Sequence, residues 1–141
     1  MTWMRVDIES DGPIPGDYSM ISIGAVVVDD NLDRTFRRDL RPISENYRGD
    51  ALKICGVSRE TSLGYPDAAE VMKDFERWVD ENSDGRPGFI SDNNGFDWMF
   101  ICWYFHHFCR RNPFGYSSMN LGSLYKGYVR DLTQNFKHLR E

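Results

Sequence analysis

The first 40 residues alternate between apolar stretches and short polar turns, a pattern that predicts three closely spaced β-strands. Residues 3–9 form the first stretch. Residues 19–29 form the second, whose near-continuous run of isoleucine and valine is typical of a strand buried on both faces. Residues 34–40 are more polar, as expected for a strand at the edge of a sheet. Because a parallel crossover needs a dozen or more residues, these strands are expected to pair antiparallel.

Helical periodicity dominates the rest of the chain. Asp67, with Glu70 three positions later, predicts a helix start, and apolar residues then recur at i, i+3, i+4 and i+7 until residue 82. Residues 87–91 predict a fourth strand, 96–111 a second helix and 121–131 a third. This order predicts an α/β fold with a mixed β-sheet flanked by helices, in which three antiparallel strands precede a strand parallel to the first.

Composition indicates one globular domain over residues 1–141, with 40% hydrophobic and 28% charged residues. The N-terminus lacks a signal-peptide pattern, and the most apolar segment, residues 96–109, is shorter than the roughly 20 residues that cross a bilayer. Three cysteines give no complete disulfide framework. We therefore expect a cytoplasmic protein that does not engage membranes. The net charge of −5 argues against a protein that binds nucleic acid through a general positive field.

Three carboxylates stand out at the predicted strand ends. Asp7 and Glu9 are expected on the same side of the first strand, with Ile8 turned into the core. Asp97 falls in the first helical turn after the fourth strand, at the same edge of the sheet. Hard divalent cations such as Mg²⁺ and Mn²⁺ prefer carboxylate oxygens, so the trio is a candidate metal site. Each part of this trio also has a simpler explanation. Asp7 and Glu9 are also compatible with the solvated end of a strand, and Asp97 is also favoured at a helix N-terminus by the helix dipole.

Several segments, in order along the chain, resemble the DEDD (DnaQ/RNase T-like) family of 3′–5′ exonucleases, which has the ribonuclease H-like fold. Asp7 and Glu9 match the first motif, Asp-x-Glu, and residues 22–26 resemble the glycine-bearing strand that follows it. Residues 54–60 resemble a family segment in which Cys55 stands where histidine is common. Residues 93–97 match the second motif, N-x-x-F-D, and 120–125 occupy the place of a stretch that usually begins with Asp.

This resemblance implies a two-metal hydrolase that trims the 3′ end of single-stranded RNA or DNA. Asp7, Glu9 and Asp97 are the implied catalytic residues and ligands of two Mg²⁺ or Mn²⁺ ions. The implied substrate-binding residues lie beside these carboxylates in the sequence: Ser10, Gly12, Asn93 and Phe96.

One family element has no match in the sequence. The third motif is a His or Tyr base followed within a few residues by a fourth carboxylate. His138 is followed by three residues and lacks an aspartate in that place, so the base role is not assigned to it. We expect the natural polypeptide to continue past Glu141 with this motif and a last helix; otherwise the domain does not catalyse normally.

Two other functional interpretations remain open. Cys102, His106 and Cys109 fall on one face of the second helix, beside His107, and with Cys55 or His138 they suggest a zinc-held interaction module. The second interpretation is a catalytically silent nucleic-acid-binding relative. Its evidence is a basic cluster of five arginines: Arg34, Arg37, Arg38, Arg41 and Arg48.

The second helix is predicted to be apolar nearly all round between Phe96 and Phe108. Such a helix is buried on more than one side. Part of this surface is therefore a candidate homodimer contact, and the simpler alternative is packing against the sheet and the third helix.

Overall fold

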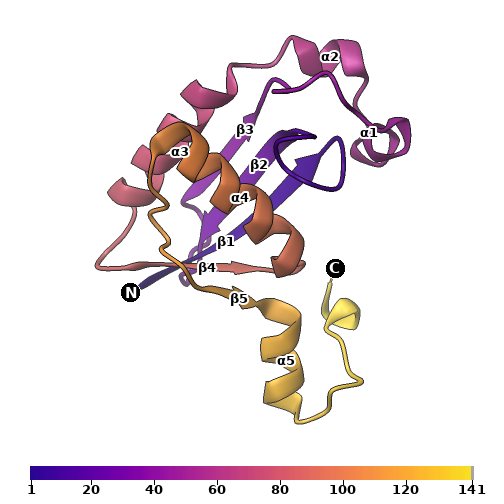
Figure 1. Ribbon diagram of the computed structural model, residues 1–141. Helices are drawn as coiled ribbons and strands as arrows, with labels where there is room; N and C mark the ends of the chain where they lie inside the picture. The colour runs from indigo at the N-terminus through magenta and orange to yellow at the C-terminus, as the bar shows by residue number, and fades with distance from the viewer. Residues whose placement is uncertain (141) are drawn as a thin grey trace.

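Five strands form one mixed sheet in the computed structural model, which describes residues 1–140 (Figure 1). The strand order is β3-β2-β1-β4-β5. Antiparallel pairing joins β1 to β2 and β2 to β3, and parallel pairing joins β1 to β4 and β4 to β5. Both expected pairings are thus confirmed. The strand bounds are β1 Thr2–Ser10, β2 Met20–Val27, β3 Thr35–Asp39, β4 Pro87–Ser91 and β5 Ser118–Asn120.

Five α-helices and a short 3-10 turn connect or follow these strands. Their bounds are α1 Gly49–Cys55, α2 Arg59–Leu63, α3 Ala68–Glu81, α4 Asn94–Cys109, α5 Leu121–Val129 and η1 Lys137–Leu139. Asp67 is the N-cap of α3, and its side chain accepts a hydrogen bond from the Glu70 backbone N–H at 3.2 Å, as its position predicts. The sequence interpretation missed α1, α2 and β5, and it placed the start of α4 two residues too late.

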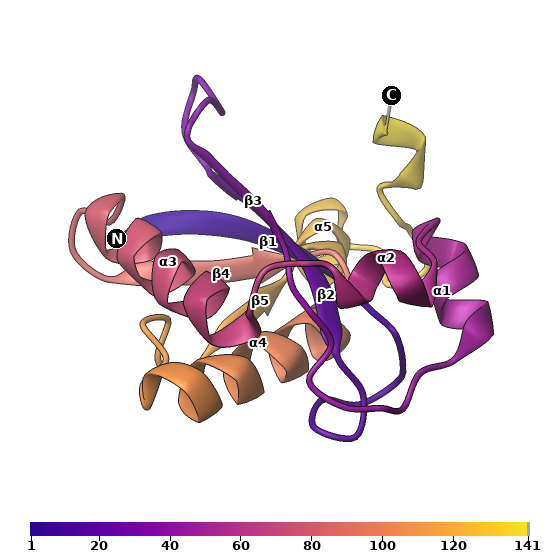
Figure 2. The ribbon, with the colours of Figure 1, turned by 90° about the horizontal axis from the view of Figure 1, so that it is seen from above.

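Helices α3 and α4 pack on one face of the sheet, as Figure 2 shows from above. The core lies in this layer. From β1 it takes Met4, Val6 and Ile8, and from the helices it takes fully buried side chains that include Phe75 and Phe105, whose ring centroids lie 5.4 Å apart. No helix within residues 1–140 is long and apolar enough to cross a membrane.

Strand β1 presents opposite kinds of side chain on its two faces. Val6 and Ile8 are at most 5% exposed, whereas Asp7 and Glu9 are exposed on the other side. The pairing register with β2 shifts between Glu9 and Ser10, where regular alternation ends. The core-facing residues of β1 thus fix which way the two carboxylates point.

Candidate functional site

The third carboxylate reaches β1 from the first turn of α4. One oxygen of Asp97, Oδ1, accepts a hydrogen bond from the backbone N–H of Ile8 at 3.3 Å. Because Ile8 lies between Asp7 and Glu9, this contact places the Asp97 carboxyl group beside the part of β1 that carries both. Two segments far apart in the chain therefore meet at this end of the sheet, as the sequence predicts.

The Asp97 carboxyl group is only 2% exposed. Burial raises its pKa from the ordinary 3.8 to about 6, and the nearby negative charge of Asp7 adds to this shift. Its second oxygen, Oδ2, has no hydrogen bond of good geometry within residues 1–140, and neither have Ser91 Oγ and Asn94 Oδ1, although the Ser91 hydroxyl group lies near enough to Asp97 to offset part of the rise in its pKa. Buried polar atoms without partners are uncommon in proteins, and two of these three belong to Ser91 and Asp97, which lie close together where β4 leads into α4.

The donor chemistry at this point suits a divalent cation. The unpartnered atoms are oxygens, and Mg²⁺ and Mn²⁺ prefer oxygen ligands. Within the described part of the chain, no group of three or more His, Cys, Asp or Glu side chains is already arranged to hold a metal ion. Asp7 is exposed at the strand surface and its side chain can turn, whereas the exposed Glu9 carboxylate accepts a hydrogen bond on one oxygen. The residues present therefore fit an oxygen-bound cation once the Asp7 side chain turns toward Asp97.

Asp92, the residue after β4, is engaged by two arginines. Arg5 Nη2 lies 3.0 Å from Asp92 Oδ2, and Arg140 Nη2 lies 2.7 Å from the same oxygen. These ion pairs anchor the end of the chain beside the carboxylate site. The sequence reasoning missed this cluster because its members lie far apart in the chain.

The substrate-binding residues expected from the sequence occupy the turns around the carboxylates. Ser10 Oγ donates a hydrogen bond to the Gly12 carbonyl oxygen at 2.7 Å, and a side chain at Gly12 would overlap the ring of Tyr18. Asn93 is the N-cap of α4, where its carbonyl oxygen accepts from the Asp97 backbone N–H at 3.0 Å. Phe96 packs on Phe100, with ring centroids 5.0 Å apart. These contacts give each residue a local structural role, and substrate contact stays a prediction.

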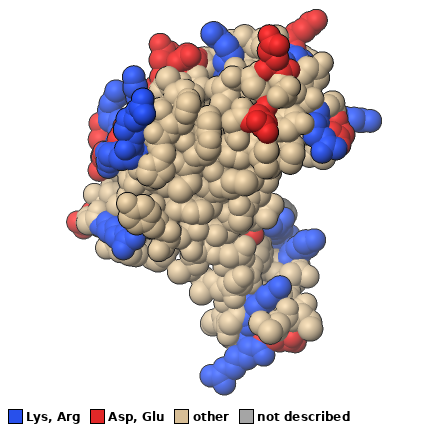
Figure 3. All heavy atoms as spheres, viewed as in Figure 1, with Lys and Arg blue, Asp and Glu red and all other residues tan. Residues whose placement is uncertain are grey.

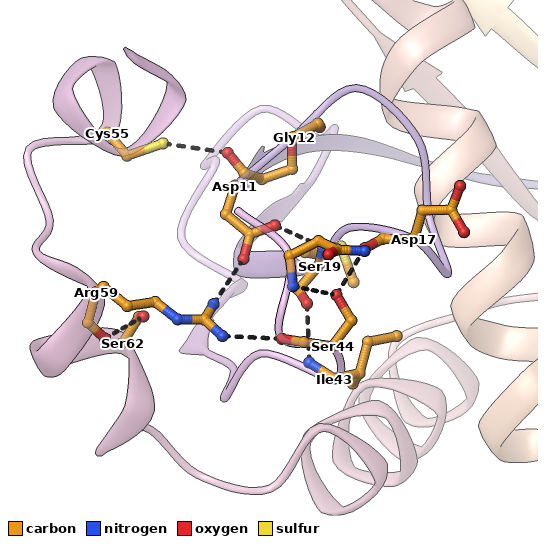
Figure 4. Close-up of polar contacts among 12 residues, drawn as sticks. Asp11, Gly12, Asp17, Ser19, Ile43, Ser44, Cys55, Arg59 and Ser62 are labelled. Atoms are coloured by element: carbon orange, nitrogen blue, oxygen red, sulfur yellow. Dashed lines mark hydrogen bonds and ion pairs between the residues drawn. The ribbon is translucent and has the colours of Figure 1, made fainter. Parts of the chain in front are cut away.

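Cys55, at the end of α1, lies against Glu9. Its thiol donates a hydrogen bond to Glu9 Oε2 at 3.3 Å and lies 3.6 Å from the Ser10 carbonyl oxygen. Figure 4 shows its side chain pointing toward the chain that follows β1. Burial raises the pKa of this thiol to about 11, and the carboxylate of Glu9 contributes to the shift. The thiol therefore stays protonated and able to donate at neutral pH.

An ion pair between the partly buried Arg59 and the buried Asp11 fixes the segment that carries Cys55 (Figure 4). Arg59 Nη1 lies 3.2 Å from Asp11 Oδ2, while Arg59 Nη2 donates to the Ser44 carbonyl oxygen at 2.9 Å. The other oxygen of Asp11 accepts from the Ser19 backbone N–H at 2.6 Å. Asp11 is fully buried, and burial raises its pKa despite these partners.

A small cavity of about 100 Å³ opens beside Glu9 and Cys55. Its wall includes Ser22 on β2, Val57 and Tyr65. The cavity lies between Glu9 of the carboxylate site and residues 54–60, the segment that resembles a family motif.

The zinc-module interpretation finds no support in the described residues. Cys102 Sγ accepts a hydrogen bond from Asn112 Nδ2 at 3.3 Å, and the His107 ring stacks on Trp103 with centroids 4.4 Å apart. His138 Nε2 lies 3.4 Å from the Tyr125 hydroxyl. A structural zinc site has four ligands, and within residues 1–140 no group of three or more His, Cys, Asp or Glu side chains is arranged to hold a metal ion.

The basic cluster is engaged in local ion pairs and hydrogen bonds. Four of its arginines lie within 4 Å of an aspartate, and the fifth, Arg41, donates to the Tyr65 carbonyl oxygen at 3.1 Å. These contacts weaken the case for a free phosphate-binding surface on this part of the protein.

Charged side chains are sparse over the side of the molecule that carries α4. Figure 3 shows a broad uncharged area there, with Lys, Arg, Asp and Glu around its margin. Trp103 and Cys102 on this helix are half-buried, and His106 and His107 are exposed. This surface is consistent with the expected homodimer, which stays a prediction.

Comparison with known proteins adds independent information. No family model matches the sequence. The chain is 38% identical over 128 residues to the 3′-5′ DNA exonuclease Cap18 of Escherichia coli, a match that covers 89% of this chain and 68% of that protein.

Solved structures of exonuclease I share the fold. A product-bound exonuclease I matches with a TM-score of 0.73 and 15% identity over 91% of this chain and 31% of its own. E. coli exonuclease I in complex with a dT13 oligonucleotide matches with a TM-score of 0.73 and 15% identity over 91% of this chain and 29% of its own. The chain thus spans about a third of the length of these exonuclease I chains.

Proposed function

Because this chain belongs to the DEDD (DnaQ/RNase T-like) family of 3′–5′ exonucleases, we propose that, in a form that also carries the His or Tyr base and the fourth carboxylate, it hydrolyses single-stranded DNA from the 3′ end. The DNA substrate is proposed from the relative with 38% identity, which is named a DNA exonuclease. RNA is the competing substrate, and the experiment below compares the two.

The observation that carries this proposal is the contact between Asp97 and β1. A buried carboxyl group reaches the backbone N–H of Ile8 at 3.3 Å, between two further carboxylates, and keeps its second oxygen without a partner in residues 1–140. Burial of a carboxyl group that keeps one oxygen without a well-formed hydrogen bond is costly, so its presence here supports a role in binding a cation.

Asp7, Glu9 and Asp97 are the proposed ligands of Mg²⁺ or Mn²⁺. When bound, two such ions supply an activated water and neutralise charge on the scissile phosphate. The polypeptide supplies the carboxylates and their orientation. Asp97 is held by the Ile8 N–H, and Asp7 and Glu9 point away from the core because Val6 and Ile8 are buried in it.

The cavity beside Glu9 and Cys55, of about 100 Å³, is too small for a whole nucleotide, and we propose that it receives one edge of the terminal nucleotide. It adjoins one proposed metal ligand, and the Tyr65 ring in its wall offers a surface for stacking. The close turn at Gly12 and the Ser10 hydroxyl group lie on the same side of the molecule, next to Glu9 in the chain.

The proposal is tested with 5′-labelled single-stranded DNA and RNA of the same sequence, incubated with Mn²⁺ or Mg²⁺. We expect shortening from the 3′ end of DNA and its loss in Asp7→Asn and Asp97→Asn. Asp67→Asn is the matched control, because it removes one negative charge but keeps a good N-cap for α3.

Two results would overturn this function. Undiminished trimming in Asp7→Asn or Asp97→Asn would remove the proposed ligands. Binding of DNA without any shortening in Mn²⁺, by a form that carries the third motif, would favour the silent nucleic-acid-binding relative.

A further inference from the structure

We propose that Cys55 is a positioning residue for this reaction: its thiol orients the Glu9 carboxylate for binding a divalent cation. The inference rests on the proposed function, because it concerns a ligand of the proposed metal site. The residue concerned is Cys55, which stands where histidine is common in the family segment that residues 54–60 resemble.

The geometry at Glu9 supports this role. Cys55 Sγ lies 3.3 Å from Glu9 Oε2, and within residues 1–140 it is the one side chain that donates a hydrogen bond to Glu9. An exposed glutamate otherwise samples several rotamers, and each must be abandoned when a cation binds. A donor on one carboxylate oxygen restricts these rotamers and leaves the other oxygen free.

The thiol has little freedom to move because its helix is tied to the end of β1. The backbone N–H of Arg48, the N-cap of α1, donates to the Asp11 carbonyl oxygen at 2.8 Å. At the other end of α1, Gly56 adopts φ of +70°, and the chain then reaches Arg59, which pairs with the Asp11 carboxylate. Asp11 therefore holds the helix from both sides, two residues after Glu9.

Thiols elsewhere in the chain provide a matched comparison. Cys109 is also free and half-buried, but it lies at the far end of α4, twelve residues after Asp97. At 1.5 Å per residue, this separation is about 18 Å along the helix axis. Modification of Cys109 thus tests the effect of losing a thiol without touching the carboxylate site.

The experiment measures Mn²⁺ binding by calorimetry, and kcat and KM for single-stranded DNA, in Cys55→Val, Cys55→Ser and Cys109→Ser. Valine has a similar volume but no donor, whereas serine keeps one. Residues that orient metal ligands typically contribute 10–100-fold to metal affinity, and a thiol is a weak donor, so we expect about 10-fold weaker Mn²⁺ binding in Cys55→Val. We expect kcat to fall with it, KM for DNA to stay unchanged, and Cys55→Ser to recover most of both losses.

The outcomes separate this inference from the function on which it rests. Wild-type Mn²⁺ affinity in Cys55→Val overturns the positioning role while leaving the exonuclease proposal intact. Equal losses in the Val and Ser variants also overturn it, because they indicate packing instead of hydrogen bonding. A wild-type protein that neither binds Mn²⁺ nor trims DNA removes both. Cys55→Ala replaces the valine variant if thermal unfolding shows that Cys55→Val is not folded.

Discussion

Replacing Asp97 with asparagine is expected to stabilise the metal-free protein at neutral pH while abolishing metal binding. The carboxyl group is 2% exposed, and burial raises its pKa from 3.8 to about 6. The folded protein therefore binds a proton at Asp97 more tightly than the unfolded chain does. Stability falls as pH rises through the window from about 4 to about 6, where the unfolded chain has already lost this proton and the folded protein still holds it.

The expected difference in stability between the wild type and Asp97→Asn follows from the pKa shift of Asp97. A difference of about two pKa units corresponds to about 3 kcal/mol between the two protonation states. Asparagine has the same shape, keeps an oxygen that can accept from the Ile8 N–H, and carries no charge that burial penalises. At pH 7.5, Asp97→Asn should therefore be about 2–3 kcal/mol more stable than the wild type, and at pH 4 the two should be nearly equal.

Urea unfolding in the presence of a chelator, at pH 4, 5, 6 and 7.5, measures this difference directly. Asp67→Asn serves as the control, because the N-cap of α3 accepts the Glu70 N–H with either side chain. Adding millimolar Mn²⁺ should then stabilise the wild type and leave Asp97→Asn unchanged, since a ligand stabilises only the state that binds it.

The reasoning would be refuted by parallel stability curves. If the wild type and Asp97→Asn differ by the same amount at every pH, the carboxyl group does not titrate with a raised pKa. A variant less stable than the wild type at pH 7.5 would show that the charged carboxylate has partners that compensate its burial.

Three further substitutions test the supports of the site, each by urea unfolding against the wild type. Arg59→Met should cost about 3–5 kcal/mol because it leaves the buried Asp11 carboxylate without its cation, and a loss below 1 kcal/mol would contradict the importance of this pair. Gly12→Ala should cost about 1–3 kcal/mol through overlap with Tyr18, and an unchanged midpoint would show that the turn relaxes easily. Phe75→Ala should cost about 3–5 kcal/mol because this ring contacts several core aromatics, and a smaller loss would indicate collapse of the cavity.

The main elements of the fold were predictable because their patterns are local. The apolar run in residues 20–27 produced a strand close to the expected bounds, and β4 occupies the predicted residues 87–91. The cap at Asp67 and the apolar period after it located α3. In each case the signal lies within a single element and does not depend on what packs against it.

The missed elements depend on contacts that are distant in the chain. β5 has three residues and exists through its pairing with β4. α2 has five residues with a Ser58 cap, too few for a periodic pattern. α1 starts without a side-chain cap, and its N-cap backbone N–H bonds to the Asp11 carbonyl oxygen.

The candidate site also contains residues that were predictable from the sequence and a contact that was not. Asp7 and Glu9 were placed on one side of a strand by alternation, and Asp97 was placed at the sheet edge by topology. The contact between Cys55 and Glu9 could not be derived from spacing, because it requires the turn after β1 to fold against a helix that the sequence did not predict. Only the resemblance of residues 54–60 to a family segment pointed to that region.

The two faces of β1 also make the site intolerant of misalignment between strands. Its acidic side chains alternate with the apolar ones that fill the layer under α4, from Val6 to Glu9. A slip of one position against β2 would exchange the two sets, driving both carboxylates into a dry interior and exposing Ile8 to water. The free-energy cost of that exchange holds β1 in its pairing register. The packed core thereby determines where the acidic side chains are placed.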